Sequence, residues 1–439
     1  MNDDVRFERL FADGLHELAP RRAPDRLRTT IKAQTGETHP RARWLALIKE
    51  PTMRSNNRVA VGSPSARVAA IMAATLLAAM MIIGAGIAGA RLLAAGGPLV
   101  VDASGGGDFT SIQAAVDAAD DGDEILVKPG LYAEAITIEE KDVAVRGDGP
   151  VEDVVVERGG GTLLTLTDTA SDVSNLTLRG DGDTTGMRLH RGSPVVSGLV
   201  FDDVGVPYQS GEIGSGSSLI IMGGTAQVLD NHFIGGGEVM VSLDADVVME
   251  GNEFRDGPHL YLQNPGDEAI VRGNTFSGSY DRAMGLFGES TMLIEGNTIE
   301  DAGRDGITIG WQSSPGHDPL VRDNDISGTA IGIMVFARTG PVIEGNRLSG
   351  NDTGIWGQSD AATYSGNHLT GNDTGLQLRG SPQLDGNIIE DGRVGIVVSG
   401  EDSTPTLTDN TICGNEENVQ ISGLTNAPPL AYDDTNEIC

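Results

Sequence analysis

The stretch "IEGN" at residues 294–297, repeated as "IEGN" at 343–346, decides the fold of this chain. A hydrophobic residue stands three positions before the asparagine, and another stands two positions after it. The same frame recurs, if Tyr364 counts as hydrophobic, around Asn231, Asn252, Asn274, Asn297, Asn324, Asn346, Asn367, Asn387 and Asn410. The spacing of about 22 residues marks a solenoid, in which each coil repeats one structural unit.

The units are short strands, because their apolar residues alternate over four to six positions and glycine interrupts them. Such coils stack with backbone hydrogen bonds running from one coil to the next. Asparagine suits the bend because it tolerates left-handed backbone angles, and its amide both donates and accepts along a stack. We therefore predict a structural asparagine ladder. "FTSIQAAVDAAD" at 109–120 predicts a helix, with Thr110 and Gln113 as a capping box, that covers the first coil.

A charge-free segment of 23 residues, 68–90, is long enough to cross a bilayer. Residues 1–67 carry 13 basic and 8 acidic residues, whereas the chain beyond Arg91 carries 16 basic and 55 acidic ones. Basic residues resist translocation, so we expect the amino end in the cytoplasm. The predicted organisation is a helical cytoplasmic segment (1–67), a transmembrane helix (68–90), a linker (91–97) and an extracytoplasmic domain (98–439). A cleaved signal peptide is the alternative if translation begins at Met53.

The acidic outer region argues against nucleic acid as a partner. Cys413 and Cys439 both lie on the expected oxidising side, which predicts a disulfide that ties down the end of the chain. Neither cysteine has the spacing of a metal site, so we expect no metal centre. "DDGDE" at 120–124 lacks the spacing of a calcium loop, which leaves weak calcium binding open and predicts no other cofactor.

The sequence resembles the right-handed parallel β-helix superfamily of pectate lyases, polygalacturonases and pectin methylesterases. Residues 100–149, which include "DFTSIQAAVDAADDGDEILVKPGLYAEA", are similar to the amino-terminal motif of pectin methylesterases. The "GNTF" and "GNTI" coils look like the repeats of periplasmic copper-maturation proteins. The resemblance implies an all-β, single-stranded parallel β-helix. It does not imply an activity, because the catalytic motifs of pectin methylesterases are missing and Asp305 lacks the acidic partners found in polygalacturonases.

In the pectinolytic relatives the substrate lies on the outer face of one sheet. Alternation along the matching strands here predicts two outward columns without a single Asp or Glu. For proton abstraction beside a uronate we name four candidates, Glu238, His259, Tyr261 and Arg282, on neighbouring coils at one edge of this sheet. For ligand binding we name the aromatic residues of the face, which are Tyr261, Phe287, Phe336 and Trp356.

We therefore predict a membrane-anchored β-helix protein that recognises a polysaccharide or a cell-envelope component without catalysis. Two alternatives stay open, a polysaccharide lyase or uronate epimerase at Glu238, His259 and Tyr261, and a structural or oligomeric surface protein. The sequence alone does not decide whether the protein is an enzyme, and it does not identify a cytoplasmic partner for residues 1–67.

Overall fold

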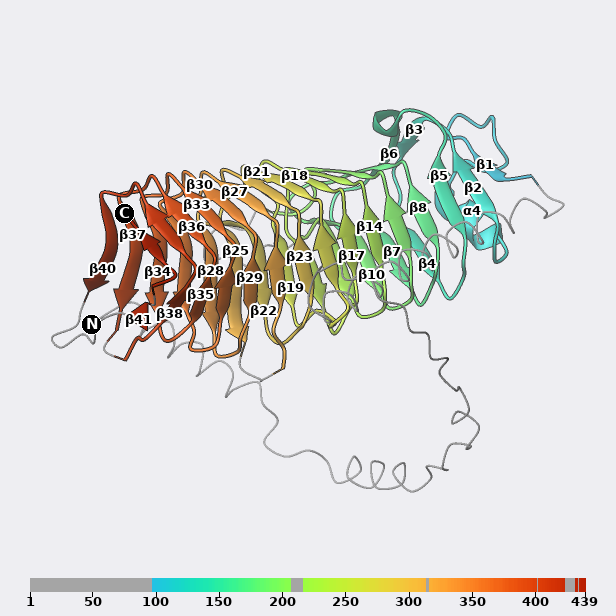
Figure 1. Cartoon of the computed structure of the whole chain (residues 1–439). Helices are drawn as coiled ribbons and strands as arrows, with labels where there is room; N and C mark the ends of the chain where they lie inside the picture. Colours follow the sequence, from blue (N-terminus) through green and yellow to red (C-terminus); the bar gives the residue numbers. More distant parts are fainter. Residues whose placement is uncertain (1–96, 207–215, 313–315, 401, 423–430, 433) are drawn as a thin grey trace, which may run out of the picture. The chain divides into compact units, whose positions relative to one another are not determined.

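The structure, a computed structural model, describes residues 97–206, 216–312, 316–400, 402–422, 431–432 and 434–439. This part of the chain winds into a right-handed parallel β-helix (Figure 1), which confirms the predicted fold class of the outer region. The predicted cytoplasmic segment and transmembrane helix lie outside the described residues. Within the described ranges, no helix combines the length and the apolar character that a membrane span requires.

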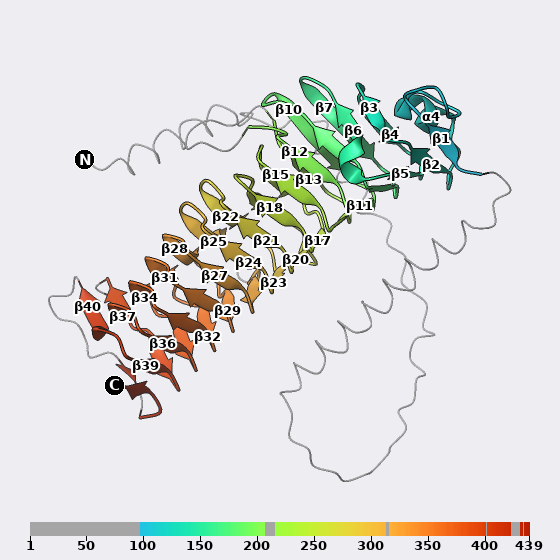
Figure 2. The ribbon, with the colours of Figure 1, turned by 90° about the horizontal axis from the view of Figure 1, so that it is seen from above.

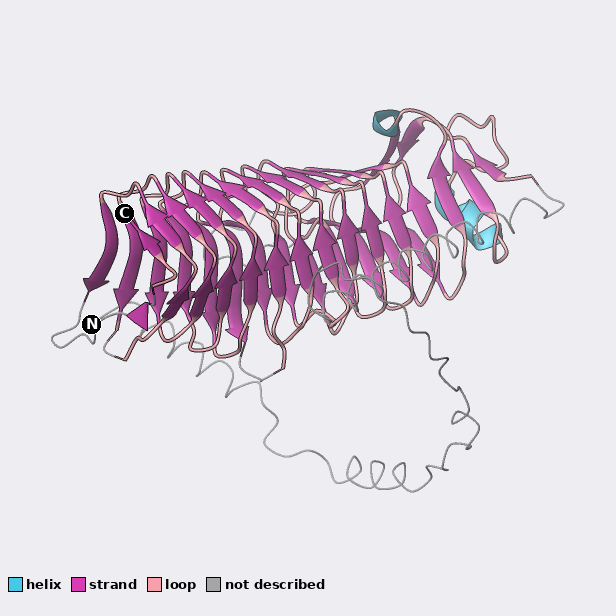
Figure 3. Cartoon of the chain, viewed as in Figure 1, coloured by secondary structure: helices cyan, strands magenta, loops and turns pink. Residues whose placement is uncertain are grey.

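Each full coil contributes one strand to each of three parallel sheets (Figure 3), here named A, B and C. Sheet A contains β1 (Leu99–Val101), β2 (Glu124–Val127), β5 (Ala144–Gly147), β8 (Asp172–Ser174), β11 (Val195–Ser197), β14 (Gln227–Leu229), β17 (Val248–Glu250), β20 (Ile270–Arg272), β23 (Leu293–Glu295), β26 (Leu320–Arg322), β29 (Val342–Glu344), β32 (Thr363–Ser365), β35 (Gln383–Asp385), β38 (Thr406–Thr408) and β41 (Ala431–Tyr432).

Sheet B contains β3 (Gly130–Tyr132), β6 (Val154–Glu157), β9 (Thr177–Arg179), β12 (Val200–Asp202), β15 (His232–Ile234), β18 (Glu253–Arg255), β21 (Thr275–Ser277), β24 (Thr298–Glu300), β27 (Asp325–Ser327), β30 (Arg347–Ser349), β33 (His368–Thr370), β36 (Ile388–Glu390), β39 (Thr411–Cys413) and β42 (Glu437–Ile438).

Sheet C contains β4 (Ile136–Glu139), β7 (Gly161–Thr167), β10 (Thr184–His190), β13 (Leu219–Met222), β16 (Val239–Ser242), β19 (Leu260–Gln263), β22 (Arg282–Phe287), β25 (Asp305–Gln312), β28 (Ile331–Ala337), β31 (Thr353–Gln358), β34 (Thr374–Arg379), β37 (Val394–Ser399) and β40 (Glu417–Ser422). Figure 2 shows the strands from β22 to β37 following one another along the stack.

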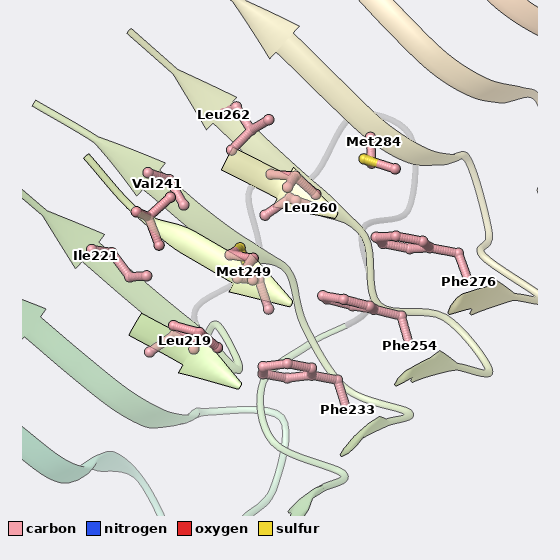
Figure 4. Packing of buried hydrophobic residues seen from close by; sticks show 14 of the residues in the cluster. Leu219, Ile221, Phe233, Val241, Met249, Phe254, Leu260, Leu262, Phe276 and Met284 are labelled. Carbon is pink, nitrogen blue, oxygen red and sulfur yellow. The ribbon is translucent and has the colours of Figure 1, made fainter. Parts of the chain in front are cut away.

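The core is a set of continuous rows, because register partners on successive coils project the same kind of side chain inward. Phe201, Phe233, Phe254 and Phe276 form one such row in sheet B, with ring centroids 4.2–4.7 Å apart. Figure 4 shows three of these rings stacked, with aliphatic side chains of sheet C beside them. A coil cannot bury its inner residues alone, so the fold depends on this stacking.

The predicted asparagine ladder is confirmed, and it occupies the bend between sheets A and B. The Nδ2 group of each of the nine asparagines donates to Oδ1 of the next one, over 2.8–3.0 Å. Asn436 extends the row by one member. A second, shorter ladder, which was not predicted, lies between sheets B and C, where Nδ2 of Asn351 donates to Oδ1 of Asn372 over 3.0 Å.

The two ends of the stack are closed differently. At the first coil, α4 (Ile112–Ala118) packs against β1, β2 and β4, as predicted for a covering helix. The predicted capping box was wrong, because the N-cap is Ser111 and the carboxylate of Glu134 accepts from the first helical N–H groups. The short 3-10 helix η3 spans Val151–Asp153. In the last coil, a disulfide joins Cys413 in β39 to Cys439.

Candidate functional site

The outer face of sheet C carries the two predicted columns in the predicted register. Along one column, the register partners are Ile220, Met240, Tyr261, Gly285, Thr308, Met334, Trp356 and Gln377. Along the other they are His190, Met222, Ser242, Gln263, Phe287, Gly310, Phe336, Gln358 and Arg379. From β10 to β34 these rows contain no carboxylate, in a protein with a formal charge of −33. Nearer the first coil, Glu139 in β4 continues the row of His190.

Tyr261 and Phe287 form an aromatic platform on this face. Their ring centroids lie 5.2 Å apart in a stacked arrangement, and both side chains are half-buried. The guanidinium of Arg282 lies 5.3 Å from the centre of the Phe287 ring, which is a cation–π distance. A β-carbon on Gly285 or Gly310 would come within 3.0 Å of the Phe287 ring, so these glycines give the ring room to lie flat.

The other two aromatic candidates lie further along the stack. Phe336 is 38% exposed and Trp356 is half-buried. In register, Trp356 is opposite Met334 rather than Phe336. The four aromatic candidates thus lie on the same face, and the close ring pair that the structure records among them is Tyr261 with Phe287.

Glu238 and His259 lie together, with Oε2 of Glu238 3.6 Å from Nε2 of His259, but His259 is only 5% exposed. Strict alternation would place the imidazole on the outer face beside Tyr261. The chain instead bends where sheet B leads into sheet C. Gly306 and Gly332 occupy the position of His259 in later coils. β-carbons at these glycines would contact core side chains, so this position points into the interior.

Burial decides the protonation of this pair. Desolvation, with a smaller contribution from the positive charge of Arg282, lowers the pKa of His259 to about 4, although Asp281 opposes the shift. Burial also raises the pKa of Glu238. Both shifts favour the neutral forms, so His259 is an uncharged imidazole at neutral pH.

Next to this pair lies a polar cluster of which the sequence singled out Arg282 as a candidate and Asp305 as an acid without its partners, but not Asp281 or Arg304. Nε of Arg282 donates to Asp281 over 2.9 Å, and Arg304 contacts both Asp281 and Asp305. Asp305 is fully buried, and its Oδ2 accepts from the Thr308 hydroxyl over 2.9 Å. The spacing "YDR" at 280–282 and "GRD" at 303–305 repeats an acid–arginine pair on successive coils, which is the signal that could have identified the cluster.

One known protein family and several solved structures are similar to this chain. Residues 238–428 match the model of the family described as periplasmic copper-binding protein (NosD). The chain has the right-handed parallel β-helix fold of the pectin lyase-like proteins. No curated protein matches the sequence.

Solved structures similar to this β-helix include the catalytic domain of a GH87 α-1,3-glucanase in complex with nigerose. That alignment has 13% identity, a TM-score of 0.48, and covers 77% of this chain and 68% of the other. The A-module of a mannuronan C-5 epimerase from Azotobacter vinelandii aligns at 16% identity and a TM-score of 0.39, over 72% and 94%. A family 28 exopolygalacturonase from Yersinia enterocolitica aligns at 12% identity and a TM-score of 0.43, over 78% of each chain.

The described residues of this β-helix do not fit a copper centre. Among them, the only set of three or more histidine, cysteine and carboxylate groups close enough to share an ion is Cys413, Glu437 and Cys439. The two sulfurs are joined in the disulfide, so they are not thiolate ligands. In "DDGDE", Asp121 and Asp123 accept backbone N–H groups and Glu124 pairs with Arg146.

Proposed function

We propose that this β-helix recognises a polysaccharide or another saccharide component of the cell envelope on the outer face of sheet C, without chemical turnover. The observation that carries the proposal is the Tyr261–Phe287 platform, which lies half-exposed between rows that contain no carboxylate from β10 to β34. Aromatic rings stack on the apolar faces of sugars, and the flat outer surface of a solenoid offers a chain of sugars several adjacent contacts.

The surroundings of the platform support a saccharide ligand. Gln263 and Gln358 lie in the same column as Phe287 and provide amide groups that can hydrogen-bond to sugar hydroxyls. Arg282 is fixed against the Phe287 ring by Asp281, so its orientation is set before a ligand arrives. Preorganised groups reduce the entropy cost of binding.

Catalysis by Glu238, His259 and Tyr261 is less well supported. A base that removes a proton from a bound sugar must come within hydrogen-bond distance of it. The His259 imidazole is buried at the bend between sheets B and C, whereas Tyr261 faces outward. We therefore assign His259, with the half-buried Glu238 beside it, to the bend of the fold rather than to the ligand face.

The proposed location is extracytoplasmic, with residues 68–90 as a single membrane anchor and residues 1–67 in the cytoplasm. The match to a family described as periplasmic supports the location of the β-helix. The charge-free segment and the basic residues that precede it support the anchor and its orientation.

A panel of neutral, acidic and amino polysaccharides tests the proposal by binding and by product formation. We expect the full-length chain to bind at least one of them, and Tyr261→Ala and Phe287→Ala each to weaken binding about tenfold. Leu131→Ala, which removes an exposed side chain on sheet B, is the control. A product that disappears in His259→Gln would overturn the assignment to recognition alone, and binding unchanged in both aromatic variants would overturn the site.

A further inference from the structure

The outer face of sheet A carries an aliphatic column that the proposed function does not use. Val248, Ile270, Leu293, Leu320 and Val342 are register partners on five successive strands. All five side chains are half-buried, while the residue after each one is buried in the core. With about 4.8 Å between coils, the column is about 19 Å long.

A second column runs beside it and alternates in charge. Its members on the same strands are Glu250, Arg272, Glu295, Arg322 and Glu344. Within the chain, Arg272 pairs with Glu250 at 2.7 Å and Arg322 pairs with Glu295 at 2.6 Å. These carboxylates and guanidinium groups are partly exposed and retain room for further partners. The ten residues of the two columns are called the sheet A stripe below.

We propose that the sheet A stripe is a self-association surface, on which two copies of this chain pack face to face with antiparallel solenoid axes. Sheets pack in this way at a separation of about 10 Å. A two-fold axis parallel to the strands sets the aliphatic column on its own counterpart and reverses the order of the coils. The other in-plane two-fold axis would set aliphatic side chains on charged ones, so the stripe selects the antiparallel arrangement.

Reversing the coils makes the charged columns complementary, because a shift by one coil sets Glu295 and Glu344 opposite arginines of the second copy, while Glu250 lies opposite the uncharged Ser365. The favoured register centres the two-fold axis between β23 and β26, so that Leu293 lies opposite Leu320 of the second copy. Glu295 then faces Arg322, and Arg272 faces Glu344. A register shifted by one coil the other way would set Glu344 on Leu229, which leaves a charge on an apolar side chain. Both copies contribute the same patch, and each pair of facing residues occurs twice, as a closed two-fold dimer requires.

Cysteine crosslinking of the full-length chain tests the register. We expect a mixture of Leu293→Cys and Leu320→Cys chains to form a disulfide-linked dimer more rapidly than either variant alone. Val195→Cys, on the same face but outside the stripe, is the matched control and should not crosslink in any mixture. Crosslinking that is equally fast in all mixtures would overturn the proposed register.

Sedimentation of the full-length chain tests the association itself. We expect a concentration-dependent dimer that Arg322→Glu weakens at least about tenfold, and that the reversed pair Glu295→Arg with Arg322→Glu restores. Ile388→Arg, on the exposed face of sheet B, should leave the dimer unchanged. The reversed pair also keeps the ion pair within the chain, so a thermal melt of each variant separates lost association from lost stability. A wild-type chain that stays monomeric at all concentrations overturns the proposal.

Discussion

The hydroxyl of Tyr364 occupies the space that a side chain at Gly357 would need. A β-carbon on Gly357 would lie 2.2 Å from the phenol oxygen. Tyr364 projects inward from sheet A, at a position where Ile343 and Leu384 stand in the neighbouring coils, and Gly357 lies in sheet C. The larger tyrosine therefore fits because the facing sheet has no side chain at that point.

Substitution at Gly357 should destabilise the solenoid through overpacking. We expect Gly357→Ala to lower the free energy of unfolding by about 2 kcal/mol, because the new methyl group displaces the Tyr364 ring. Gly97→Ala is the control, since a β-carbon there contacts nothing. Urea denaturation measures both, and an equal effect of the two substitutions would show that the interior adapts to the methyl group.

Removal of the Tyr364 hydroxyl should have the opposite effect. Tyr364 is fully buried, and its hydroxyl has no hydrogen-bond partner among the described residues. Because a buried polar group without a partner costs about 1–3 kcal/mol, Tyr364→Phe should raise the free energy of unfolding by about 1 kcal/mol. In the double variant with Gly357→Ala, much of the alanine penalty should vanish. Additive effects in the double-mutant cycle would contradict the proposed contact.

The asparagine ladder should be most sensitive in its middle. Oδ1 of Asn297 accepts from the buried backbone N–H of Asn274, and Nδ2 of Asn297 donates to the carbonyl of Val271, so Asn297→Ala removes the partner of both groups. We expect a loss of about 3 kcal/mol in the free energy of unfolding. Asn436→Ala, at the partly exposed end of the row, should cost about 1 kcal/mol. Equal losses at the two positions would mean that burial along the row does not set the cost.

The disulfide should hold the last coil in place. It closes a loop of 26 residues in sequence, and β42 otherwise pairs only through its parallel neighbour β39 among the described strands. By loop entropy such a crosslink is worth about 3 kcal/mol. We expect Cys413→Ser with Cys439→Ser to accelerate amide exchange in β39 and β42 while β23 and β24 stay protected. Exchange that rises uniformly along the stack would contradict local fraying.

The sequence predicted the parts of the fold that depend on the repeat. The ladder from Asn231 to Asn410 and the outward columns through Tyr261 and Phe287 follow from a fixed period, because equal positions in successive coils meet in register. Features that join different sheets were not predicted. The contact between Tyr364 and Gly357 crosses the interior, and no spacing along the chain relates the two residues.

In the candidate site too, the features set by the repeat were predicted and those set by contacts between sheets were not. The aromatic residues Tyr261 and Phe287 were assigned to one face from alternation alone, and the structure brings them into contact. The position of His259 could not be predicted from alternation, because the bend between sheets B and C turns the residue just before β19 inward. The aliphatic column of sheet A was not predicted, because each member directly precedes a core residue. In the sequence the two adjacent apolar residues look as if both were buried.

The buried His259 should make the solenoid sensitive to acid. Its pKa in the folded state is about 4, below the value near 6.5 of an exposed histidine, so the unfolded chain binds more protons between these values. Stability is therefore complete above pH 6.5 and falls as the pH drops toward 4, by about 3 kcal/mol from this group. Glu238, whose pKa burial raises, acts in the opposite direction, since its protonated form is favoured by folding.

Urea titrations of the wild type and His259→Gln at a series of pH values isolate this contribution. We expect the difference in unfolding free energy between the two proteins to change by about 3 kcal/mol from pH 6.5 to pH 4, in favour of the variant at low pH. Leu131→Ala, which alters an exposed side chain that carries no titratable group, is the control and should parallel the wild type at every pH. Parallel curves for the wild type and His259→Gln would mean that the imidazole takes up its proton within the fold as easily as in water, which its burial at the bend argues against.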